Sequence, residues 1–195
     1  MSRHRILSFV APALLVFAGT ASAEQRYFEF TGTVTQSRDS SLAPVGATVR
    51  GTFNYDDATV GDYFDNMALY DVDAELVADI NGHALVSDRT SITLYDYLNT
   101  GGDIVWVYST PGIMVDHTFH GTGYFGFSLF GAGLDSLALP SSYDLAKFHI
   151  AEGALFLNDT DGVLVDFSID TITSLPAPCL KKNGKVDRHC KDKGR

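Results

Sequence analysis

Period-two alternation of apolar and polar residues is the feature that most constrains the fold of this 195-residue chain. In residues 27–35, Phe28, Phe30 and Val34 fall on one side and the polar residues between them on the other. The same alternation runs through residues 47–55 and 163–170. Successive side chains of an extended chain point to opposite faces, so these stretches predict strands with one buried and one wet face.

Further strands are predicted where β-branched and aromatic residues gather between turn residues. They span residues 74–80, 83–86, 91–98, 104–108, 124–130, 148–150 and 154–157. Asn81-Gly82 and Asp161-Gly162 favour two-residue hairpin turns, and residues 143–148 could form one helical turn. We therefore expect an all-β fold, a single antiparallel β-sandwich of jelly-roll type over residues 24–175.

The first 23 residues have the features of a cleaved signal peptide. Arg3 and Arg5 precede an apolar run over residues 6–17, and Ala21-Ser22-Ala23 provides the small residues of a cleavage site. The apolar run is too short to cross the roughly 30 Å of a bilayer core. We expect an exported protein without a transmembrane segment, in the periplasm, at the cell surface or outside the cell.

Charge is unevenly distributed along the chain, whose formal net charge is −10. Residues 24–180 contain 22 of the 24 acidic residues and only five of the 14 Lys and Arg residues. Such an acidic body would repel phosphates, which argues against a nucleic acid as partner. The hydrophobic content of 45% excludes a disordered chain.

Residues 176–195 form a basic tail. Cys179 and Cys190 bracket its central segment, and in an oxidising compartment they most simply pair with each other. One interpretation is a tail that binds anionic polysaccharide or lipid headgroups. The other is a solvated terminus, or one that folds back onto the acidic body. The anion-binding candidates are Lys181, Lys182, Lys185 and Arg188.

An acidic stretch makes calcium a candidate cofactor, because Ca²⁺ takes six to eight oxygen ligands. Asp71, Asp73 and Glu75 would point to one face of a strand and would repel one another without a cation. The alternative is that these acids provide solubility and protect a strand edge. The candidate ligands are Asp56, Asp57, Asp62, Asp65, Asp71 and Asp73.

Three other sites give weaker signals. His117 and His120 could bind zinc on a helix, but the surrounding residues favour a strand or loop, where the two rings point apart. Trp106 could be a sugar-stacking platform, although its apolar neighbours favour packing in the core. Ser128 lacks the second glycine of a nucleophile elbow, so no catalytic residue is assigned.

Several segments resemble a widespread group of exported bacterial β-sandwich proteins, many of which end in a sorting signal of the PEP-CTERM type. The resemblance is carried by residues 30–34 (FTGTV), 49–56 (VRGTFNYD), 91–96 (SITLYD), 135–140 (DSLALP) and 163–175 (VLVDFSIDTITSL). It implies an exported β-sandwich and no particular catalytic residues. The chain departs from the group after residue 175, where Pro176-Ala177-Pro178 is followed by neither the glutamate nor the apolar helix of the sorting signal.

Two functions are consistent with these features. The first is a non-enzymatic surface or extracellular-matrix protein that binds polysaccharide or another envelope component, with calcium as a candidate aid. The second is a secreted glycan-acting hydrolase in which paired carboxylates serve as acid and base. A purely structural role without a ligand is a third reading.

Overall fold

The computed structural model describes residues 24–72, 74–87, 89–96, 102–109, 112–121, 123–157 and 163–178. The predicted signal peptide and the predicted turn at Asp161-Gly162 lie outside these ranges. The described residues form antiparallel strands and one 3₁₀ turn, and contain no α-helix. The strands are β1 (Gln25–Ser37), β2 (Thr48–Asp56), β3 (Asp62–Phe64), β4 (Met67–Val72), β5 (Leu76–Ile80), β6 (His83–Ser87), β7 (Thr90–Tyr95), β8 (Asp103–Ser109), β9 (Ile113–Val115), β10 (Thr118–His120), β11 (Tyr124–Gly131), β12 (Phe148–Leu157) and β13 (Val163–Leu175).

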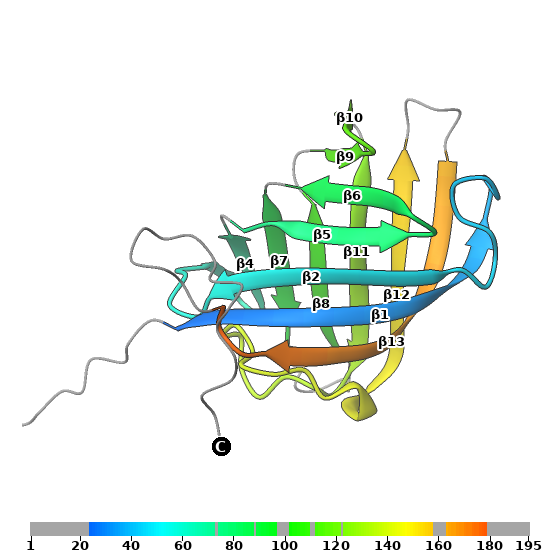
Figure 1. The fold of residues 1–195 in the computed structure, drawn as a ribbon. Helices are drawn as coiled ribbons and strands as arrows, with labels where there is room; N and C mark the ends of the chain where they lie inside the picture. The colour runs from blue at the N-terminus through cyan, green and yellow to red at the C-terminus, as the bar shows by residue number, and fades with distance from the viewer. Residues whose placement is uncertain are drawn as a thin grey trace, which may run out of the picture.

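The strands belong to one continuous sheet in the order β10-β9-β6-β5-β2-β1-β13-β12-β11-β8-β7-β4-β3. The predicted all-β, antiparallel class is therefore confirmed, but the sheet does not divide into the two separate sheets of a sandwich. It curls into a half-barrel, so that β2, β5 and β6 cross in front of β7, β8 and β11 (Figure 1). The physical reason is that β13 pairs with β1 on one side and β12 on the other, which joins both halves.

Two bulges lie where β1 and β13 join the halves of the sheet. Thr31 pairs with Thr171 while Gly32 pairs with Ile169, which leaves Asp170 as an extra residue of β13. A second shift between Val34 and Gln36 leaves an extra residue in β1. A bulge bends its strand and increases the local twist, so these irregularities accommodate the curl of the sheet.

Aromatic side chains fill the space inside the half-barrel. Phe30 of β1 and Phe53 of β2 meet Phe127 of β11, with ring centroids 5.3 and 5.4 Å apart. Phe28 stacks on Phe53 at 4.9 Å, and all four rings are at most 2% exposed. The two contacts of Phe127 join β11 to strands that are not its neighbours in the sheet, so they hold the two halves of the sheet together.

The long connection between β11 and η1 (Leu145–Lys147) is bound to one end of the half-barrel. Tyr70 donates a hydrogen bond to the Leu137 carbonyl oxygen at 2.6 Å, and Tyr55 donates to the Pro140 carbonyl oxygen. The Leu134 amide donates to Asp103 Oδ2 at 2.9 Å. Burial raises the pKa of the Tyr55 and Tyr70 phenols, which keeps them protonated as donors.

Most predicted elements match the structure, and the differences concern one strand predicted in two parts and four strands that were not predicted. The Asn81-Gly82 turn between β5 and β6 is confirmed, with positive φ values of 54° and 87°. The single helical turn is confirmed as η1, and Asp144 caps it by accepting from the Ala146 amide. Residues 148–150 and 154–157 are parts of one strand, β12. The strands β3, β4, β9 and β10 were not predicted, and three of them have only three residues.

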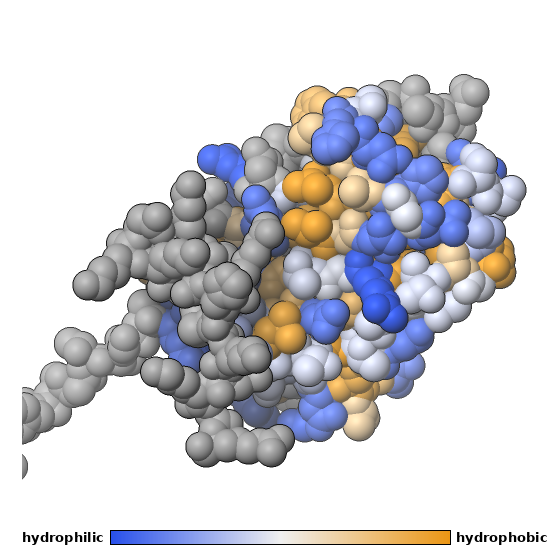
Figure 2. All heavy atoms as spheres, in the orientation of Figure 1, coloured by the Kyte–Doolittle hydropathy of each residue, from blue (hydrophilic) through white to orange (hydrophobic). Residues whose placement is uncertain are grey.

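No helix among the described residues has both the length and the apolar character needed to span a membrane. On the outer face turned to the viewer in Figure 2, hydrophilic and hydrophobic residues are mixed. Of the strands that lie in front in Figure 1, β1 and β2 expose Glu29, Arg50 and Thr52, and Val77 of β5 and Val86 of β6 are partly exposed.

Gly51 provides a test of the packing between Phe30 and β2. A Cβ at this position would lie 2.3 Å from Phe30 Cζ and 2.6 Å from the Val77 carbonyl oxygen. We expect Gly51→Ala to lower the free energy of unfolding by about 1–3 kcal/mol, measured by urea denaturation, because the ring must leave its position. Gly102→Ala is the matched control, since a Cβ there meets nothing within 4 Å. Equal stability of the two variants would contradict this account of the core.

Candidate functional site

The outer face of β8, β11 and β12 carries a row of side chains set by the strand register. Ser128 of β11 lies opposite Trp106 of β8 on one side and opposite Glu152 of β12 on the other. The alternate residues Val107 and Leu129 point into the core and are fully buried. Directly paired residues share a face of the sheet, so Trp106, Ser128 and Glu152 stand side by side on the outer face.

Two adjoining hollows lie over this row, and we call them together the aromatic–acidic groove. The first has a volume of about 400 Å³ and the second of about 490 Å³, and both are lined by Tyr124, Ser128 and Glu152. Beyond these three shared residues, the lining of the first hollow consists of aromatic residues, and the lining of the second includes polar residues. The groove residues used below are Gln36, Trp106, Tyr108, Tyr124, Ser128, Phe130, Glu152 and Asp166.

The aromatic part of the groove has accessible ring surfaces. Trp106 is 36% exposed and Tyr124 is 37% exposed, although each lies within a regular strand. Tyr95 of β7 meets the Trp106 ring edge to face, with centroids 5.6 Å apart and planes at 73°. This contact supports the indole in place and leaves surface for a ligand to stack on.

Gly126 gives β11 its close approach to β8 at the groove. A Cβ at Gly126 would lie 2.4 Å from the Val107 carbonyl oxygen and 2.7 Å from Tyr108 Cα. Gly126 pairs with Tyr108 on one side and Ala154 on the other, so small residues separate Tyr108 from the polar part of the groove. The missing side chains help to form a hollow on an otherwise regular sheet surface.

Two carboxylates form the polar part of the groove. Asp166 of β13 lies opposite Ala154, and Glu152 is two residues along β12, so the two acids are diagonal neighbours on one face. Burial raises the pKa of the Tyr124 phenol, and the nearby carboxylates of Asp166 and Glu152 raise it further. The ion pairs within the described parts of the chain involve other acids, so neither groove carboxylate is paired with a base from those parts.

The prediction that Trp106 packs in the core is wrong. Residues 104–108 are all apolar, but β8 occupies a central position between β7 and β11 with only its odd-numbered residues directed inward. Val105 and Val107 fill the core, which leaves Trp106 on the outer face.

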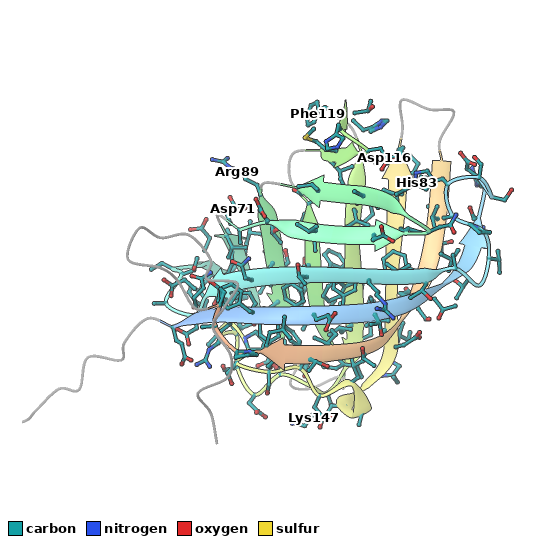
Figure 3. All side chains as sticks on the ribbon, viewed as in Figure 1. Asp71, His83, Arg89, Asp116, Phe119 and Lys147 are labelled. Carbon is teal, nitrogen blue, oxygen red and sulfur yellow. The ribbon has the colours of Figure 1, made fainter. Side chains whose placement is uncertain are left out.

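The acidic residues considered for calcium have separate environments. Asp57 forms an ion pair with Arg26, with Oδ2 and Nη2 2.9 Å apart, and accepts from the Glu24 amide. These two contacts hold the pKa of Asp57 below its usual value. Asp71, near the end of β4, accepts a hydrogen bond from the Ser91 hydroxyl at 2.8 Å (Asp71 is labelled in Figure 3).

The other calcium candidates are distributed along the chain. Asp56 ends β2, Asp62 begins β3, Asp65 lies in the β3–β4 turn and Glu75 lies between β4 and β5. The strand thought to carry Asp71 and Glu75 on one face is interrupted, since β4 ends at Val72 and β5 begins at Leu76. No three His, Cys, Asp or Glu side chains of the described residues form a group that could hold a metal ion. Asp73 lies outside the described residues, so a calcium site that includes it stays a prediction.

The two histidines considered for zinc lie on either side of a turn. Asp116 and His117 are the turn residues between β9 and β10, with φ values of 46° and 70°, whereas His120 is buried at the end of β10. Asp116 instead contacts His83, with Oδ2 and Nδ1 2.6 Å apart, and accepts from the Ala84 amide at 2.8 Å (Figure 3). This ion pair ties the β9–β10 hairpin to the start of β6.

The basic tail falls outside the described residues from Cys179 onward. The disulfide predicted between Cys179 and Cys190, and the anion-binding role predicted for Lys181, Lys182, Lys185 and Arg188, therefore stay predictions.

Glu152, Asp166 and Tyr124 were not identified as site residues from the sequence. Each lies on the outward side of an alternating strand, where a polar or aromatic residue is unremarkable. The only available signal was the series Tyr124, Gly126, Ser128 and Phe130, which places small and aromatic residues on one face. This series indicates a binding site only because β8 and β12 lie on either side of β11, which the sequence does not show.

Comparison of the chain with models of known protein families, with curated proteins and with solved structures finds no match.

The contact between His83 and Asp116 predicts a pH-dependent contribution to stability. The Asp116 carboxylate raises the pKa of His83, and His83 together with the Ala84 amide lowers the pKa of Asp116. The stability contributed by His83 is lost as the pH rises through the folded-state pKa of His83. The stability contributed by Asp116 is lost as the pH falls through the folded-state pKa of Asp116. The pair therefore stabilises most between the unfolded-state values, about 4 and about 6.5.

We expect Asp116→Asn to lower the melting temperature more at about pH 5.5 than at about pH 9, because the charge pair exists only at the lower of these two values. The Asn side chain can still accept from the Ala84 amide and tolerates a positive φ. Glu29→Gln removes an exposed carboxylate of β1 and is the control. Thermal unfolding followed by circular dichroism measures both, and an equal effect of Asp116→Asn at the two pH values would contradict the prediction.

Proposed function

We propose that this protein is an exported, non-enzymatic polysaccharide-binding protein of the cell surface or extracellular matrix, and that the aromatic–acidic groove holds the polysaccharide. One observation carries this proposal. Accessible rings at Trp106 and Tyr124 lie in the same groove as the carboxylates of Glu152 and Asp166.

This combination suits a sugar, whose ring has an apolar C–H face and a polar rim of hydroxyl groups. The C–H face can stack on Trp106 or Tyr124, which removes apolar surface from water. The hydroxyl groups can donate hydrogen bonds to Glu152 and Asp166, and bonds to an ionised acceptor are stronger than those between neutral groups. Gln36 and Ser128 add neutral hydrogen-bonding groups to the same lining.

The location of the groove suits a long ligand. Its residues come from β8, β11, β12, β13 and β1, which are consecutive in the sheet. A regular sheet face presents side chains in fixed directions, so several sugar units could be contacted with little ordering cost. The predicted signal peptide and the resemblance to exported proteins support a location where polysaccharides occur, and the basic tail would offer a second attachment to an anionic envelope component.

A secreted glycan hydrolase is the second candidate, and the pair of carboxylates in one groove favours it. Glycosidases place two carboxyl groups on either side of the bond that they cleave. Glu152 and Asp166 are diagonal neighbours on adjacent strands, which places both within reach of one sugar linkage. Release of reducing ends from a glycan panel, abolished by Glu152→Gln or Asp166→Asn, would replace binding by hydrolysis as the function.

The binding proposal predicts that Trp106→Ala weakens polysaccharide binding by about tenfold or more, because the stacking surface is lost. Affinity electrophoresis in gels that contain single soluble polysaccharides measures the change as loss of retardation. Phe119→Ala removes an aromatic side chain that is 63% exposed on edge strand β10 and is the matched control (Figure 3). Unretarded wild-type protein across neutral, amino and acidic polysaccharides would overturn the proposal.

A further inference from the structure

The carboxylates of the groove have no basic partner within the described residues. The Lys and Arg residues of the described ranges are Arg26, Arg38, Arg50, Arg89 and Lys147, and neither these nor any described histidine lines the groove. Arg26 is engaged by Glu24 and Asp57, and Lys147 lies beside a different hollow near η1 (Figure 3). With respect to the described residues, Glu152 and Asp166 therefore present negative charge that no base compensates, beside aromatic rings.

Because of this arrangement, the charge of a sugar should determine how tightly the groove binds it. Covering a carboxylate with a neutral sugar removes water from it and returns only hydroxyl donors, whereas an ammonium group returns hydrogen bonds together with an opposite charge. An ammonium group near an indole or phenol ring is also attracted to the face of that ring. A uronate would instead bring a like charge to the groove of a strongly acidic body.

We propose that the aromatic–acidic groove selects glycans that carry protonated amino groups, with Glu152 and Asp166 as the ammonium-binding residues and Trp106 and Tyr124 as the stacking surfaces. This inference rests on the proposed function, because it specifies which polysaccharide the groove binds. It assigns the two acids to specificity and the two rings to binding of sugars in general.

The position of Tyr124 supports a shared subsite. Tyr124 lines both hollows, and the two carboxylates lie close enough to raise the pKa of its hydroxyl group, after the larger effect of burial. A sugar stacked on Tyr124 would therefore have its substituents within reach of Glu152 and Asp166. Single removal of either acid should reduce selectivity while the rings continue to bind.

The test compares three β-1,4-linked oligosaccharides of equal length, built from glucosamine, N-acetylglucosamine or glucuronate. Binding is measured by isothermal titration calorimetry in a buffer acidic enough to protonate the amines, with EDTA present so that no metal ion bridges the acids. The proteins are the wild type, Glu152→Gln, Asp166→Asn and Glu29→Gln. Glu29→Gln changes the net charge equally but lies on β1 outside the groove lining.

We expect the wild type to bind the glucosamine oligosaccharide at least about tenfold more tightly than the N-acetylated one, and to bind the glucuronate most weakly. Added salt should narrow this difference, because it screens charges. Glu152→Gln and Asp166→Asn should each remove most of the preference and keep binding to the N-acetylated oligosaccharide, whereas Glu29→Gln should keep the wild-type preference.

Two contrary results have different meanings. Equal or tighter binding of the neutral oligosaccharide, or a preference unchanged in both groove variants, would overturn the selection of amino sugars and leave the polysaccharide-binding function standing. Absence of binding to all three oligosaccharides and to the polysaccharides of the gel assay would overturn both proposals. Melting curves of each variant establish that it is folded, and the two acids on different strands provide independent tests.

Discussion

The contact of Phe30 and Phe53 with Phe127 is the interaction on which the rest of this structure depends. These rings come from β1, β2 and β11, and they meet only when the sheet curls over itself. Each aromatic side chain buries about 150–250 Å² and its truncation in a core costs about 3–5 kcal/mol. The bulges between β1 and β13 allow the bend, and the rings make the bent form favourable.

The same alternation that builds this core also builds the groove. In β11 the inward residues Phe125, Phe127 and Leu129 are buried, so Tyr124 and Ser128 must point outward. A register slip of one residue would exchange these two sets. The aromatic core therefore holds the groove residues in place indirectly, because burial of Phe127 sets which face of β11 is available to a ligand.

The ends of the sheet are held by polar contacts. Tyr70 and Tyr55 bind the β11–η1 connection across one end, and the ion pair of His83 with Asp116 fastens the β9–β10 hairpin. The outermost strands β10 and β3 have three residues each, which limits the backbone offered to another sheet. These contacts lie away from the outer face of β8, β11 and β12, which carries the groove.

The sequence by itself determined the strands that alternate over many residues, such as β1, β2 and β13, and the hairpin at Asn81-Gly82. These features follow from local physics, since period two and the φ preferences of Asn and Gly do not depend on distant residues. Short strands such as β3 and β10 lack enough residues to show a period. The prediction that Trp106 packs in the core fails because β8 has apolar residues on both faces. Its sequence therefore does not indicate which face meets the core.

Only the tertiary structure decided that the strands form one curled sheet and that Trp106, Glu152 and Asp166 share a groove. These three residues are far apart in the chain, and their proximity depends on the strand order β13-β12-β11-β8. Strand order is set by which apolar faces and rings pack together over long sequence separations, and many orders are compatible with the same local alternation. The candidate site could therefore not be read from the residues that compose it.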